Sequence, residues 1–168
     1  MSRHVPAEHY DQDMSNETQR RGRSVTLGPV GETVMRNITY HRTLRKLSIA
    51  ALADLVTRQG HRLTRQALSE VELGNRRVDV DDLVALARAL DISPATLLMP
   101  LTRDHDDTVE VIGDASAPAE VVWSWLTAEV PLDYRPGYGH TPEGEADINE
   151  FRRDSHPSWS RSNHSEAG

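Results

Sequence analysis

The chain of 168 residues contains no cysteine and few hydrophobic or aromatic residues. The absence of cysteine excludes disulfide bonds, thiolate zinc sites and cysteine nucleophiles. Hydrophobic residues make up 37% of the chain and aromatic residues 5%, which is too little for every segment to join a core. We therefore expect one compact domain accompanied by accessory segments.

Long apolar runs are missing too. No stretch of about 18 apolar residues exists that could span a bilayer. The opening residues, MSRHVPAEHYDQD, lack the apolar centre of a secretory signal. These two absences predict a cytoplasmic protein that makes no membrane contact.

The sequence motifs that usually accompany catalysis are not found either. The chain has no glycine-rich phosphate loop and no G-x-S-x-G motif. Its eight histidines show no H-E-x-x-H or similar spacing for a metal, and nothing places two carboxylates in one rigid pocket. We expect a protein that is not an enzyme and that holds neither a cofactor nor a metal ion.

The net charge of −7 is unevenly distributed along the chain. Residues 1–31 balance four arginines against four acidic residues. Residues 32–102 carry nine arginines and one lysine against eight acidic residues, or +2, and residues 103–168 carry five arginines against fourteen, or −9. Such asymmetry is typical of proteins that bind polyanions, although an acidic tail can also simply maintain solubility.

Helical periodicity begins at Glu32. Val34, Ile38, His41 and Leu44 recur at intervals of four, three and three residues, which predicts the inward face of a first helix. A histidine on such a face is expected to be a partly buried core residue rather than a metal ligand.

A second helix is expected after Ser48, whose hydroxyl can cap its first turn. Leu52, Leu55 and Val56 then point inward, and Ala53 is small enough to let another helix approach closely.

The third predicted helix, Thr64–Leu73, is short and amphipathic. Thr64 can cap it, and Gly74 is placed to end it. Leu68 and Val71 lie three residues apart on one face, so the helix can attach to a core through that face alone.

Two further helices complete the expected domain. Asp79 can cap a fourth helix, with Asp82 as the acidic partner three residues later. Ser93 and Pro94 can open a short fifth helix. Residues 32–102 therefore predict a compact five-helix, all-α unit near the lower size limit for an independent core.

The segments on either side of residues 32–102 lack this regular helical pattern. Residues 1–31 are expected to form a disordered N-terminal arm and residues 136–168 a disordered tail, because both lack sustained periodicity. Residues 103–135 are expected to form a small extension with a strand around Val109 and a short helix after Pro118.

Two tryptophans, Trp123 and Trp125, fall in that short helix and point to different sides of it. Core packing is the expected role of both. The alternative is that one of them packs on the helical unit and the other serves a dimer contact.

The segments LSIAALADLV, LTRQALSEVELGNRR and VDVDDLVALARALDISPATLL resemble, in this order, parts of the Cro/C1-type helix-turn-helix domain of bacterial and phage regulators. The resemblance covers residues 32–102 and implies a lambda-repressor-like DNA-binding fold. It also implies that Glu72 braces the fold by pairing with an arginine.

In such a domain the third helix enters the DNA major groove, and its N-terminal side chains meet base edges. The side chains expected to project there are Thr64, Arg65, Gln66, Ser69 and Glu70. Arg65 could bind guanine, Gln66 adenine, and Ser69 either base, whereas Glu70 could accept from cytosine or weaken binding.

Cations outside this helix are candidates for phosphate contacts. Arg76 and Arg77 follow Gly74 and are expected to hold phosphate. Arg58, His61 and Arg62 lie in the connection between the second and third helices, where they too could reach the DNA backbone. Solvent exposure without any contact is the alternative for each.

Two departures from the family pattern bear on the docking of the domain. Members usually open the second helix with a glutamine that binds phosphate, whereas Ile49 and Ala50 stand there in this chain. The connection from Leu52 to Leu63 is also about five residues longer than the common form, which lengthens the turn.

These features predict a sequence-specific DNA-binding regulator, repressor-like, that acts as a homodimer on double-stranded DNA. Pairing would let two third helices reach half-sites about 34 Å apart and would double a small basic excess. The alternative is a helix-turn-helix-derived interaction module, or antitoxin-like component, that binds a protein partner through its C-terminal extension.

Overall fold

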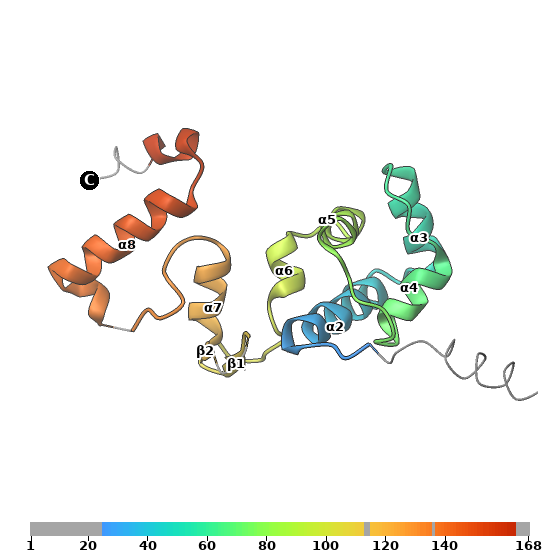
Figure 1. Cartoon of the computed structure of the whole chain (residues 1–168), viewed down its shortest axis with the longest axis horizontal. Helices are drawn as coiled ribbons and strands as arrows, with labels where there is room; N and C mark the ends of the chain where they lie inside the picture. The colour runs from blue at the N-terminus through green and yellow to red at the C-terminus, as the bar shows by residue number, and fades with distance from the viewer. Residues whose placement is uncertain (1–24, 113–114, 136, 164–168) are drawn as a thin grey trace, which may run out of the picture.

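The computed structural model describes residues 25–112, 115–135 and 137–163. Its elements follow in the order α2 Pro29–Leu44, α3 Ile49–Arg58, α4 Arg65–Glu72, α5 Val80–Ala89, α6 Pro94–Leu98, β1 Thr108–Glu110, β2 Ser116–Pro118, α7 Ala119–Leu126, η1 Tyr138–His140, α8 Pro142–Ser155 and η2 Ser158–Asn163. Figure 1 shows α2 to α6 grouped at one end of an elongated molecule, with α7 and the strands beside them and α8 at the other end.

Capping side chains set the starts of four of the five helices α2 to α6. Ser48, Thr64, Asp79 and Ser93 each accept a hydrogen bond from a backbone N–H two or three residues later, at the first turns of α3, α4, α5 and α6. These bonds satisfy donors that a helix start leaves unpaired. The expectation of caps at all four positions is confirmed.

Two glycines end the two central helices, α3 and α4. Gly60 and Gly74 take φ values of +93° and +76°, a region that side chains disfavour. The N–H of the residue after each glycine donates to the carbonyl five residues before it, which is the Schellman ending. The chain therefore reverses sharply after both helices.

One apolar core holds α2 to α6 together. Its fully buried members include Ile38, Leu52, Leu68, Leu86 and Leu97, one from each helix. Because every helix contributes a side chain to the same cluster, none of the five can move without disturbing the others.

A buried amide joins the first and last helices of this unit. Asn37 of α2 is fully buried, and its Nδ2 lies 2.9 Å from the carbonyl oxygen of Leu97 and 2.7 Å from that of Met99. These carbonyls belong to the end of α6, where intrahelical donors run out. Asn37 therefore acts as a C-terminal cap supplied from another helix.

A second long-range link joins α2 to α4. Nε and NH2 of Arg42 donate to the two carboxylate oxygens of Glu72 over 2.6 and 2.8 Å, and NH1 donates to the carbonyl of Leu47. The hydrogen bonds to Glu72 raise the pKa of Arg42. The expectation that Glu72 braces the fold is confirmed, and the brace is a bidentate pair.

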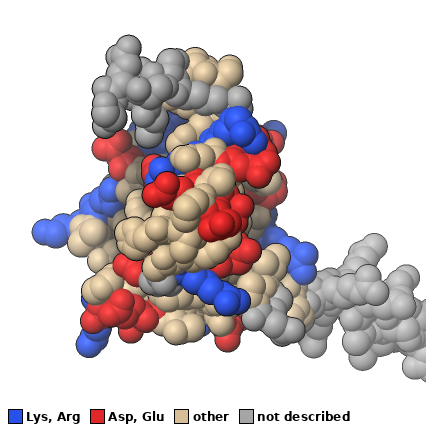
Figure 2. All heavy atoms as spheres, turned by 90° about the vertical axis from the view of Figure 1, so that its left-hand side faces the viewer, with Lys and Arg blue, Asp and Glu red and all other residues tan. Residues whose placement is uncertain are grey.

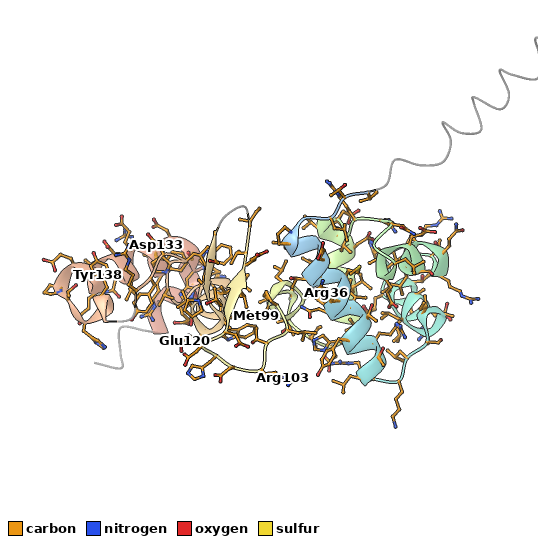
Figure 3. All side chains as sticks on the ribbon, turned by 90° about the horizontal axis from the view of Figure 1, so that it is seen from below. Arg36, Met99, Arg103, Glu120, Asp133 and Tyr138 are labelled. Carbon is orange, nitrogen blue, oxygen red and sulfur yellow. The ribbon has the colours of Figure 1, made fainter. Side chains whose placement is uncertain are left out.

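The residues after α6 form a smaller cluster of their own. Strands β1 and β2 pair antiparallel, with Val109 opposite Ala117, and Val109, Val111 and Val122 are buried between the sheet and α7. Met99 packs against this cluster and lies where the two parts of the molecule meet (Figure 3). The extension is thus attached to the helical unit through the end of α6.

The structure corrects three expectations about chain organisation. The chain as a whole is not all-α, because the extension contains a two-stranded sheet. Residues 136–168 are not wholly disordered, because α8 spans Pro142–Ser155. The first helix begins at Pro29, inside residues 1–31, which were expected to form an arm; residues 1–24 of that arm lie outside the described part of the chain.

The first helix also departs from its expected inward face at its last turn. Leu44 is 62% exposed, because α2 ends there and the chain turns away at Arg45. His41 is half-buried as expected, and burial, followed by the charge of Arg45, lowers its pKa.

Among the described residues, no helix is both long enough and apolar enough to cross a bilayer.

Replacing Asn37 with alanine is expected to lower the free energy of unfolding by about 2 kcal/mol, because it leaves buried carbonyls at the end of α6 without a donor. Urea denaturation followed by circular dichroism measures the change. Asn75→Ala is the matched control, since Asn75 is exposed and such substitutions stay within about 0.5 kcal/mol. Equal stability of the two variants would contradict the capping role.

Replacing Glu72 with glutamine is expected to cost about 3 kcal/mol, because it leaves a largely buried guanidinium without its counter-charge. The control is Glu32→Gln, which breaks an exposed pair with Arg36 and should change stability by less than about 1 kcal/mol. The same urea titration compares them. If both cost equally little, the Arg42–Glu72 pair does not hold α4 to α2.

Candidate nucleic-acid interface

Helix α4 is anchored to the domain along one side only. Leu68 and Val71 are fully buried, and they are the two buried residues of its eight. Thr64 caps its start by accepting from the N–H of Ala67 over 3.1 Å. The helix is therefore fixed at its inner face and its N-terminus, and the opposite face is left available.

The N-terminal turn of that opposite face carries the strongest candidates for base contacts. Thr64, Arg65 and Gln66 are exposed. Within the described part of the chain, Arg65 and Gln66 have neither a hydrogen-bond nor an ion-pair partner. A helix N-terminus also favours anions, because its first N–H groups point outward and the helix dipole is positive there.

The next turn of α4 is less accessible than expected. Ser69 and Glu70 are half-buried rather than fully projecting, and the carbonyl of Glu70 accepts the backbone N–H groups of Asn75 and Arg76. The sequence predicted both residues to project because they lie on the face opposite Leu68 and Val71, and the chain after Gly74 folds back to bond with the backbone of Glu70.

Arg76 and Arg77 make contacts within the protein. NH2 of Arg76 lies 2.7 Å from Oδ2 of Asp82, and NH2 of Arg77 donates to the carbonyl of Thr26 over 3.0 Å. Both guanidinium groups keep unused donors, since arginine has five N–H bonds. Their contact with phosphate stays a prediction, and both have a structural role in addition.

The carboxylate of Asp82 organises the surroundings of α4. Asp82 is buried, and its two oxygens bind Nε2 of His61 and NH2 of Arg76, each over 2.7 Å. It was expected to complete a capping box with Asp79. Instead only its backbone N–H bonds to Asp79, and its side chain reaches across to two other segments.

This Asp82 cluster escaped the sequence analysis because its members are far apart in the chain. His61 lies in the connection before α4, Arg76 in the loop after it, and Asp82 on α5. One local signal was present: an aspartate in a first helical turn, three residues after the cap. That signal predicts a capping box equally well, so spacing alone could not identify the partners.

The first two residues of α3 carry no polar side chain that could bind phosphate as a glutamine would. Ile49 and Ala50 are half-buried, and Ile49 packs against the core. Where related domains have a phosphate-binding glutamine, this chain therefore has a side chain that packs against the hydrophobic core.

One group of residues outside the helical unit has the geometry to hold a metal ion. In the part of the chain that the structure describes, ligand atoms of Asp104, His105 and Asp106 lie within 4.8 Å of one another. All three residues are exposed, and His105 is within ion-pair distance of both carboxylates. Mutual attraction between these side chains accounts for the arrangement without a metal.

The C-terminal part of the molecule has a different charge character. Figure 2 shows the face at the α8 end, where Asp and Glu side chains are numerous and a few basic side chains lie among them. Some acids there are paired: Arg152 contacts Glu129, and Arg153 contacts Glu150. The acidic surface and α4 thus lie at different ends of the molecule (Figure 1).

Comparison with known proteins supports the reading of the helical unit. The sequence model of the helix-turn-helix family matches residues 38–97, which run from within α2 into α6. Searches of curated proteins and of solved structures each gave no match. Residues 38–97 are therefore similar to a Cro/C1-type helix-turn-helix domain, which suggests a DNA-binding regulator.

Proposed function

We propose that the protein is a sequence-specific, repressor-like transcriptional regulator in which α4 enters the DNA major groove. One observation carries the proposal: Arg65 and Gln66 lie exposed and unpartnered, among the described residues, on the first turn of a helix anchored by its other face. A major groove about 12 Å wide accepts one such helix with its N-terminal side chains at the base edges.

Each residue has a distinct expected role. Arg65 can donate two hydrogen bonds to guanine and Gln66 can bond bidentately to adenine. Thr64 and Ser69 supply hydroxyls near the same surface, and half-buried Glu70 either accepts from cytosine or weakens binding. The repressor-like character rests on the resemblance to Cro/C1-type regulators.

The proposal includes the compartment and the oligomeric state of the protein. A regulator of this kind works in the cytoplasm without an enzymatic activity or a cofactor. Action as a homodimer is part of it, because two-fold pairing presents two recognition helices to half-sites about 34 Å apart.

A second candidate function is a helix-turn-helix-derived module that binds a protein. The acidic excess of residues 103–168 and the carboxylate of Glu70 beside the reading surface favour it. Gel shifts with genomic fragments at low and moderate salt separate the two candidates, since DNA binding must weaken as salt rises. The absence of any salt-dependent retention would favour the protein-binding module.

Replacing Arg65 or Gln66 with alanine is expected to weaken binding to a selected DNA site by about 5- to 150-fold, the equivalent of 1–3 kcal/mol for one bidentate pair. It should also relax base preference at one position of the site. Selection of bound sequences from genomic DNA, repeated with each variant, measures both effects.

Arg103→Ala is the control for these two variants, because Arg103 is exposed and lies outside the helix-turn-helix domain (Figure 3). If neither α4 variant changes affinity or base preference relative to that control, α4 is not the reading element.

Trp123 of α7 offers a test of pairing. It is 41% exposed, whereas Trp125 packs against the cluster of the extension, so the expectation of core packing for both is wrong for Trp123. Tryptophan is enriched at the centres of interfaces. We expect Trp123→Ala to shift a monomer–dimer equilibrium toward monomer in sedimentation equilibrium.

Leu44→Ala, which removes an exposed apolar side chain from α2, serves as the comparison for that experiment. An unchanged dimer in Trp123→Ala would exclude this side chain from the interface, and a monomeric wild type at DNA-binding concentrations would refute pairing.

A further inference from the structure

The lengthened connection between α3 and α4, residues 59–64, is an ordered part of the domain. Gly60 reverses the chain, and the N–H of His61 donates back to the carbonyl of Val56. The imidazole of His61 is bonded to buried Asp82 over 2.7 Å, and Leu63 is fully buried. The connection is therefore tied to α5 and to the core, and its outer side chains have a fixed base.

Two cationic side chains at this connection, Arg58 and Arg62, are exposed to solvent. Both are exposed, and neither has a hydrogen-bond or ion-pair partner among the described residues. Asp54, one turn before Arg58 on α3, makes no ion pair with it in this part of the structure. By contrast, Arg42 and Arg76 are both paired with carboxylates.

Chain geometry places Arg62 next to the reading surface. Arg62 is exposed, whereas its neighbour His61 is bonded to Asp82 and its neighbour Leu63 is buried. Only three peptide units separate it from Arg65, so their Cα atoms lie within about 11 Å of each other. That is less than the width of a major groove, about 12 Å.

A helix seated in the groove therefore carries Arg62 at the groove edge, where the phosphates lie. Arg58 lies four residues earlier, on the last turn of α3, and is exposed as well. The first two residues of α3, Ile49 and Ala50, are apolar and half-buried, so they supply no polar side chain for a phosphate.

We propose that Arg58 and Arg62 form a phosphate clamp that holds the DNA backbone beside α4 without regard to base sequence. The clamp rests on the proposed function. Base specificity then comes from Arg65 and Gln66. The two arginines before α4 add electrostatic affinity that does not depend on base sequence. The added residues before α4 thus provide the backbone contact that the apolar start of α3 does not.

The test measures how binding by the full chain depends on salt. Fluorescence anisotropy is recorded with the duplex recovered by selection and with a scrambled duplex, between low and moderate salt. Each phosphate contact contributes about −0.9 to the slope of log K against log salt. Arg58→Ala and Arg62→Ala should each make the slope shallower by about 0.9, and the double variant by about 1.8.

Three comparisons give this test its specificity. Arg58→Lys and Arg62→Lys should keep the wild-type slope, because lysine still neutralises a phosphate. Arg103→Ala should also keep it, since Arg103 is exposed outside the matched domain. Base preference in repeated site selection should stay unchanged in both alanine variants, unlike in Arg65→Ala. Circular dichroism verifies that each variant is folded.

Unchanged slopes in the Arg58 and Arg62 alanine variants of a protein that binds DNA would overturn the clamp and leave the proposed function intact. A changed base preference would show that these arginines read bases and would also overturn it. If wild type shows no salt-dependent binding to either duplex, the proposed function fails, and the clamp fails with it.

Discussion

The attachment of α4 through two buried side chains is the constraint on which the domain depends. An isolated helix of eight residues is unstable in water, since helices shorter than about 12 residues are marginal even in favourable sequences. Leu68 and Val71 must supply its stability through packing, and Glu72 adds a bidentate bond to Arg42 at the C-terminal end. Because all three contacts lie on the inner side or at the end, the N-terminal outer surface carries no structural task and can be given to a ligand.

Asp82 extends the same constraint to the segments on either side of α4. A buried carboxylate costs several kcal/mol in lost hydration unless partners compensate, and here it is paired with the guanidinium of Arg76 and hydrogen-bonded to His61. The compensation ties the connection before α4 and the loop after it to α5, so the entry and exit of the helix are fixed together. The same contact engages Arg76, one of the arginines that the sequence predicts to bind phosphate.

Local signals predicted more of this fold than long-range ones could. Thr64 and Asp79 cap their helices because the capping bond spans three residues, and Gly74 ends α4 because a positive φ suits glycine. The tail shows how such a signal can be overlooked: Thr141 caps α8 ahead of Pro142, in a segment whose composition suggested disorder. The partner of Arg76 was beyond prediction, because a loop arginine has several acids within reach and only the packing of α5 selects Asp82.

The net charge of −7 does not oppose binding to DNA, because charge acts locally in salt solution. The Debye length is about 8 Å at physiological ionic strength, and Figure 1 places α8 at the end of the molecule away from α3 and α4. Arginines within the acidic part neutralise Glu129 and Glu150 in place. Around α4, by contrast, Arg58, Arg62 and Arg65 are exposed, and their charges have no partners in the described structure. The acidic C-terminal segment and the mildly basic helical unit, which are separate in the sequence, therefore also form separate surfaces in the folded molecule.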